Sequence, residues 1–108
     1  MTARMNLRTV STATANRQDF DCNNTLTGRH WYFGTGYLPD LYVDRLAADQ
    51  TADDFFVVMS YRTPIAWYAH GAWHVPNVKY SPTTSRHLSS LRLPVRVTGS
   101  GEPWAIAA

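Results

Sequence analysis

A continuous apolar run lies in the middle of the chain, at Phe55 to Ser60. The run is short and rich in aromatic and β-branched side chains, which predicts a buried strand rather than a helix. Pro64 to Tyr68 and Ala72 to Val75 are predicted to form two further strands, joined by a turn at Ala69-His70-Gly71. The centre of the chain therefore predicts a β-hairpin core.

The second and third of these strands are expected to pair through side chains on one face. In this pairing Ile65 and Trp67 lie opposite Trp73 and Val75, because aromatic and β-branched side chains stabilise one another across a hairpin. Pro76-Asn77 then ends the third strand.

Two segments show the spacing of an amphipathic helix. The first is Pro39 to Asp49, where Pro39 suits the first helical turn. Its apolar stripe is predicted to contain Leu38, Leu41, Tyr42 and Leu46.

The second helix is predicted from Pro82 to Arg92. Ser81 is a good N-cap, and Pro94 disfavours a helical residue before it. Its inner stripe is predicted to contain Thr84, Leu88 and Leu91.

The segments around these elements are less regular. Residues 1–18 have no clear apolar period, and we expect a flexible arm with a short strand near Leu7 to Val10. Residues 20–37 are turn-rich, with a short strand expected at His30 to Phe33. Turn-forming residues stand at Asn23-Asn24, Thr27-Gly28 and Gly34-Thr35-Gly36.

These elements predict an α+β fold. A small antiparallel sheet, built on a hairpin at about residues 55–75, packs against helices at about 39–49 and 82–92. A chain of 108 residues is enough for one domain, which we place at residues 19–97. A short strand is also expected at Val95 to Val97, before a flexible tail over residues 98–108.

Charge is segregated along the chain. Residues 1–18 carry three Arg and no acid, for a net +3, and residues 19–54 carry seven Asp against two Arg, for a net −5. Residues 55–96 carry four Arg and one Lys without any acid, for a net +5, and residues 97–108 carry only one Glu. Either the acidic and basic blocks lie against each other and neutralise, or the basic part meets an anionic partner.

The sequence contains few of the residue patterns that form known reactive sites. Cys22 is the only cysteine, which excludes an internal disulfide. His70 and His74 are four residues apart, but the turn at Gly71 disfavours a shared metal, so we expect neither a metal nor a cofactor. No secretory signal or membrane span is recognised, and we expect a cytoplasmic protein.

A hydrolase built on Ser81 to His87 is a weaker alternative. Its hydroxyls and His87 need an orienting acid, but residues 55–96 contain none. A carboxylate from Asp40, Asp44 or Asp53 would have to reach His87. We therefore expect that the protein is not an enzyme.

The start of the second helix is a better candidate for a binding site. Free N–H groups and the helix dipole favour an anion there, and basic residues flank it. The predicted anion-binding or nucleic-acid-binding residues are Arg62, Lys79, Ser81, Thr83, Thr84, Arg86 and His87. The alternative is that the hydroxyl groups only cap the helix.

Aromatic side chains could add to such a site. Exposed rings stack on unpaired bases, whereas buried rings would simply fill the core. The aromatic candidates are Tyr61, Trp67, Tyr68, Trp73 and Tyr80.

The stretches Ser60 to Trp67, Trp73 to Pro76 and Lys79 to His87 resemble a domain found in small proteins of actinobacteriophages. They carry the patterns S-Y-x-T-P-I-A-W, W-x-x-P and K-Y-S-x-T-T-S-x-H. Asn24 to Gly28 and Gly36 to Pro39 are similar to its leading segment, so that the resemblance spans about residues 23–92. The chain departs from the pattern at Pro82, which is compatible with a helix start. The resemblance implies a phage protein in a bacterial host, and it brings no activity, because the domain has no known function.

The leading hypothesis is therefore a non-enzymatic protein that binds nucleic acid in the host cell through its acid-free half. The alternative is a module that binds a host protein or itself, since aromatic residues also anchor protein interfaces. No membrane partner is expected.

Overall fold

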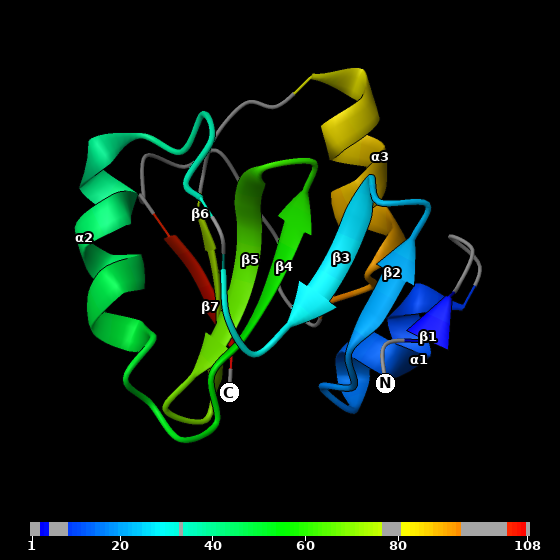
Figure 1. The fold of residues 1–108 in the computed structure, drawn as a ribbon. Coiled ribbons are helices and arrows are strands. Elements are labelled where there is room, and N and C mark those ends of the chain that lie inside the picture. Colours follow the sequence, from blue (N-terminus) through cyan, green and yellow to red (C-terminus); the bar gives the residue numbers. More distant parts are fainter. Residues whose placement is uncertain (1–2, 5–8, 33, 77–80, 94–103, 108) are drawn as a thin grey trace.

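One sheet runs through the whole structure, a computed structural model that describes residues 3–4, 9–32, 34–76, 81–93 and 104–107. Strand order follows chain order, and every neighbouring pair is antiparallel except the parallel pair β1–β2 (Figure 1). The strands are β1 (Ala3–Arg4), β2 (Phe20–Cys22), β3 (Leu26–Arg29), β4 (Phe56–Ser60), β5 (Thr63–Ala69), β6 (Ala72–Pro76) and β7 (Trp104–Ala107).

Helices cover both faces of this sheet. They are α1 (Val10–Ala15), α2 (Asp40–Asp49) and α3 (Pro82–Ser90). The α2 helix packs on one face, whereas α1 and α3 pack on the other (Figure 1). The predicted α+β class is confirmed, but the sheet is wider than the predicted hairpin and has two separate core layers.

The central strand β4 confirms the strand prediction for Phe55 to Ser60. Its side chains alternate between the two core layers: Phe56 and Val58 face α1 and α3, whereas Val57 and Met59 face α2. All five residues of β4 are buried. Burial on both faces explains why the sequence shows an unbroken apolar run instead of an alternating one.

The predicted turn between β5 and β6 is also confirmed. His70 and Gly71 both have positive φ, at 54° and 78°, as a two-residue hairpin turn requires. The Asp54 carboxylate accepts hydrogen bonds from the backbone N–H groups of His70 and Gly71, at 2.9 and 2.8 Å. The N–H of Gly71, followed by that of His70, lowers the pKa of Asp54.

The prediction of which side chains share one face of the β5–β6 hairpin is partly wrong. The register shifts between Val58, which pairs with Ala66, and Met59, which pairs with Pro64. The extra residue, Ile65, forms a β-bulge, so that Ile65 and Ala66 both join the core layer under α1 and α3.

The bulge decides where the next aromatic side chain points. Trp67 faces α2 and pairs with His74, while Trp73 and Val75 lie in the opposite core layer. Ile65 shares that layer with Trp73 and Val75, as predicted, but Trp67 does not.

The first predicted helix is confirmed as α2, with Pro39 at its N-cap. Leu38, Tyr42 and Leu46 are buried, but Leu41 is 64% exposed, so its place in the predicted stripe is wrong. The stripe continues instead to Asp49, which is buried.

The second predicted helix is confirmed as α3. The N-cap hydroxyl of Ser81 accepts a hydrogen bond from the N–H of Thr84 at 3.3 Å. His87 and Leu91 are buried, Thr84 and Leu88 are partly buried, and Arg86 is exposed. His87 was not predicted to lie on the inner face.

Both predicted flexible ends contain regular structure. The arm at residues 1–18 includes α1, where Val10 and Ala13 are buried in the core. The tail at 98–108 includes β7, which pairs with β6. The strand predicted near Leu7 to Val10 falls partly outside the described residues, with Val10 in a helix, and the strand at Val95 to Val97 falls wholly outside them.

Two of the three predicted turn sites between residues 20 and 37 are confirmed. Asn23 and Asn24 turn between β2 and β3 with φ of 52° and 60°, and Gly36 has a φ of 49°. Thr27-Gly28 is not a turn but part of β3. The strand expected at His30 to Phe33 is wrong where the structure describes it, since β3 ends at Arg29.

Gly28 is required by packing. A Cβ atom there would lie 2.3 Å from Cε1 of Phe20 and 2.6 Å from Cζ of Phe56. We expect Gly28→Ala to lower the free energy of unfolding by about 1–3 kcal/mol, because the rings must shift. Urea denaturation measures the change. Gly34→Ala is the matched control, since its nearest neighbour is 3.9 Å away; equal stability of the two variants would contradict the packing argument.

Candidate functional site

The turn between β4 and β5, Tyr61-Arg62, forms a hairpin tip beside the first turns of α3. Ser60 Oγ lies 2.8 Å from His87 Nδ1 and 3.1 Å from Thr84 Oγ1, in hydrogen bonds that join the end of β4 to the helix. The ring of Tyr61 packs on that of His87, with centroids 5.9 Å apart. These contacts bring together segments that are more than twenty residues apart in the sequence.

Three of the predicted site residues serve this junction. Ser81 caps α3, Thr84 bonds to Ser60 and Ser81, and His87 is only 5% exposed. Their contacts support the alternative interpretation, in which the hydroxyl groups and the imidazole hold the helix in place.

Three other predicted site residues are on the surface. Arg62 is exposed at the hairpin tip, and Thr83 and Arg86 are exposed on the first turns of α3. No carboxylate of the described residues lies within ion-pair distance of Arg62 or Arg86. Lys79 falls outside the described residues.

A loop lies against the hairpin tip from the side of α2. The N–H of Tyr37 donates to Thr63 Oγ1 at 3.0 Å. A Cβ on Gly36 would stand 2.6 Å from the carbonyl oxygen of Arg62, so a glycine is needed for this close approach. Tyr37 itself is 95% exposed. We call the exposed residues Tyr37, Tyr61, Arg62, Thr83 and Arg86 the tip surface.

Tyr37 was not among the predicted site residues, and of the aromatic candidates that the structure describes only Tyr61 is exposed, at 52%. Trp67 and Trp73 are buried in the core, and Tyr68 is partly buried. Tyr80 falls outside the described residues. A signal for Tyr37 was present, because an aromatic residue after a Gly-Thr-Gly turn has few neighbours to cover it.

Tyr61 also has an unfavourable backbone conformation. Its φ is 56°, in the left-handed region, which costs a residue with a side chain about 1–2 kcal/mol. Glycine and asparagine are the usual residues at such a position in a two-residue hairpin turn. The side chain is 52% exposed, so burial does little to offset the cost.

The acidic block does not cover α3. Asp40, Asp44 and Asp49 belong to α2, on the opposite face of the sheet. Among the described residues, the acidic block and the acid-free segment meet where Asp49 Oδ1 lies 3.8 Å from His70 Nε2, which is an ion pair only when the imidazole is protonated. No described Arg of residues 55–96 is paired with a described carboxylate.

The same placement keeps these carboxylates away from His87, where the hydrolase hypothesis required one. Asp40 and Asp44 are separated from His87 by the sheet. Asp53 precedes Asp54, whose carboxylate binds the turn at the other end of β5. A triad of Ser, His and one of these three carboxylates is not assembled.

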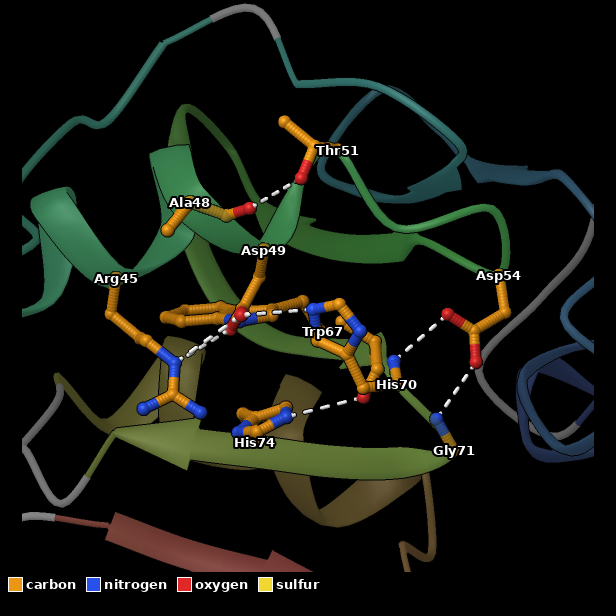
Figure 2. Close-up of polar contacts among 10 residues, drawn as sticks. Arg45, Ala48, Asp49, Thr51, Asp54, Trp67, His70, Gly71 and His74 are labelled. Atoms are coloured by element: carbon orange, nitrogen blue, oxygen red, sulfur yellow. Dashed lines mark hydrogen bonds and ion pairs between the residues drawn. The ribbon is translucent and has the colours of Figure 1, made fainter.

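A second polar cluster, which the sequence analysis missed, lies between α2 and the sheet (Figure 2). The buried Asp49 carboxylate accepts from Trp67 Nε1 at 2.9 Å and from Arg45 Nε at 3.1 and 3.2 Å. The ring of Trp67 stacks on His74, with centroids 6.4 Å apart. The i, i+4 spacing of Arg45 and Asp49, with Asp49 in line with Tyr42 and Leu46, was a readable signal.

The cluster is better suited to a structural role than to a ligand. Its carboxylate is satisfied from the sheet and from its own helix, and its Trp and His rings are buried. In the described part of the chain, no group of three or more His, Cys, Asp or Glu side chains could hold a metal ion. No helix in that part is long and apolar enough to cross a membrane.

Burial of His87 makes the junction sensitive to pH. Desolvation, followed by the charge of the neighbouring Arg86, lowers the pKa of His87 from its ordinary value of 6.5. Above pH 6.5 the ring is neutral in both the folded and the unfolded chain. As the pH falls below 6.5, the unfolded chain binds a proton first, so the free energy of unfolding decreases until the pH passes below the folded-state pKa.

We therefore expect the protein to lose stability on acidification from pH 7 to about pH 5, and we expect His87→Asn to lose less. Denaturation by urea at several pH values measures both curves. His74, whose pKa is also lowered by burial, accounts for the slope that remains. His70→Asn is the control, because His70 is exposed; parallel curves for the parent and His87→Asn would refute the assignment.

Asp49 is expected to be important for stability. Asp49→Ala leaves the buried Trp67 N–H without its acceptor and removes the partner of Arg45, which should cost about 2–3 kcal/mol. Asp44→Ala, on an exposed site of the same helix, should change the free energy of unfolding by less than about 0.5 kcal/mol. Chemical denaturation of the two variants provides the comparison, and a small effect of Asp49→Ala would mean that water replaces its contacts.

Comparison with known proteins assigns the chain to a family but identifies no activity. No curated protein and no solved structure matches the chain. One family, described as a family of unknown function (DUF8033), matches residues 5–95. This range contains the hairpin tip, α3 and the Asp49 cluster. Since the match covers most of the 108 residues, the chain belongs to this family of unknown function.

Proposed function

We propose that the protein is a non-enzymatic binding protein that engages nucleic acid through the tip surface. The observation that carries the proposal is the position of Arg62 and Arg86. Both are exposed, and the described acidic residues of α2 lie across the sheet from α3. Guanidinium groups bind phosphate oxygens well, and phosphate contacts supply most of the affinity of non-specific binding.

The start of α3 supports the same proposal. Thr83 is exposed in its first turn, which carries no acidic residue. Hydroxyl groups and free N–H groups at a helix start commonly contact phosphate. Lys79 precedes the helix and adds a further positive charge in the sequence.

The biological setting is also part of the proposal. The resemblance to actinobacteriophage proteins supports a phage accessory protein that acts in the cytoplasm of a bacterial host. A protein of this kind would meet both host and phage nucleic acid. The competing proposal, a module that binds a host protein, is favoured by the exposed side chains Tyr37 and Leu41, which are 95% and 64% exposed.

The proposal is tested by measuring binding against salt. Affinity for a labelled oligonucleotide should fall as salt rises, with a slope of about 0.7–0.9 for each phosphate contact. The triple variant Arg62→Ala, Lys79→Ala, Arg86→Ala should bind more weakly and with a slope smaller by about 2–3.

A matched variant controls for net charge. Arg92→Asn removes an exposed positive charge beyond the last turn of α3, and asparagine tolerates its φ of 52°. It should leave the slope nearly unchanged. If the triple variant binds as the parent does, the proposal is wrong, and nuclease-treated host lysate then tests for a protein partner.

A further inference from the structure

Two exposed tyrosines lie at the hairpin tip: Tyr61 is in the tip itself, and Tyr37 is in the loop whose backbone contacts it. Tyr61 lies on the side of α3, with its ring on His87. Tyr37 lies on the side of α2, where its N–H donates to Thr63. They are 52% and 95% exposed, so most of the ring surface of each is open to solvent.

The backbone that carries each tyrosine is anchored at the tip, by Thr63 at Tyr37 and by Thr25 at Tyr61. Gly36 allows the loop to approach the carbonyl of Arg62 closely, which fixes Tyr37 beside the tip. Tyr61 keeps a left-handed conformation that glycine or asparagine would adopt with less strain. Strained backbone conformations often cluster at ligand-binding positions.

We propose that the tip surface selects the unpaired bases of single-stranded nucleic acid. In this proposal, Tyr61 and Tyr37 are stacking platforms, and Arg62 binds the phosphate backbone between them. The inference rests on the proposed function and specifies its ligand. Every base offers a flat face to an exposed ring, so such stacking requires no particular sequence.

The shape of the tip disfavours the major groove of a duplex. A groove about 12 Å wide admits a helix or a two-stranded ribbon. Here the hairpin tip is not a free ribbon, because α3 contacts it on one side and the Gly36 loop contacts it on the other. Each element that packs against the hairpin tip increases its thickness by about 10 Å. Paired bases are also stacked on each other and cannot reach the two rings.

Charge favours nucleic acid over a protein partner at this surface. Arg62 follows Tyr61 in the turn, Arg86 precedes the His87 on which the Tyr61 ring packs, and no described carboxylate pairs with either arginine. Asp21 of β2, the acidic residue nearest the β2–β3 turn in the sequence, accepts a hydrogen bond from the N–H of Asn24 at 2.7 Å. A polyanion with flat, apolar bases complements both the rings and the arginines.

The test compares one sequence as single-stranded DNA, single-stranded RNA and duplex DNA, each of about 16 nucleotides, by fluorescence anisotropy. The parent should bind both single strands more tightly than the duplex. Tyr61→Asn and Tyr37→Ser should each weaken single-strand binding by about 5-fold to 100-fold, which corresponds to the stacking of one base. Duplex binding should not change.

Three controls separate stacking from folding. Tyr61→Phe keeps the ring and should keep the affinity. Tyr61→Asn relieves the strained turn, so its melting temperature should equal or exceed that of the parent while its single-strand binding is weaker. Trp31→Ser removes an aromatic ring that is 54% exposed and follows the end of β3 away from the tip, and it should bind as the parent does.

The possible failures are distinguishable. Equal affinity for duplex and single strands, or full single-strand affinity in both tyrosine variants, overturns the inference. If the inference fails in either way but the triple variant of Arg62, Lys79 and Arg86 still binds more weakly than the parent, the proposed function stands. A parent protein that binds none of the three oligonucleotides overturns both.

Discussion

Burial of β4 and β5 from both sides is the constraint on which the other elements depend. A sheet whose central strands are apolar on both faces needs a cover on each, and α2 supplies one while α1 and α3 supply the other. Buried hydrogen bonds then join α2 and α3 to the sheet. Asp49 binds Trp67 beneath α2, and Ser60 binds His87 beneath α3. Because such contacts are directional, they fix the positions that hydrophobic packing alone would leave loose.

The bulge at Ile65 connects this constraint to the hairpin tip. It moves one extra apolar side chain into the layer under α3 and turns Trp67 towards α2. Without the shift, the indole N–H could not reach Asp49. The same hairpin carries Tyr61 and Arg62 at its end, so the packing of both layers determines the direction in which the tip faces.

The features that the sequence revealed were those with a strong local cause. The apolar run of β4, the Ser81 cap and the His70-Gly71 turn each follow from a few adjacent residues. Gly28 was misread as a turn, because the need for a glycine comes from Phe20 and Phe56, which are distant in the sequence. The α1 helix has six residues, too few to show a period. Tyr37 and Asp49 each had a local signal, but their exposure and burial are decided by tertiary contacts with Thr63 and Trp67, which are distant in the sequence.

The order of the strands has a consequence for how the chain folds. Since each strand pairs with its neighbours in the sequence, the sheet can grow outward from β4, β5 and β6, which are joined by two-residue turns. Short loops lose little entropy on closure, and topologies rich in local contacts fold fast. Two connections are long, residues 30–55 with α2 and residues 77–103 with α3, and closing them is the costly step. The hairpin tip therefore belongs to the earliest part of the sheet to form, whereas its two flanks, the Gly36 loop and α3, complete the surface only when the outer layers dock.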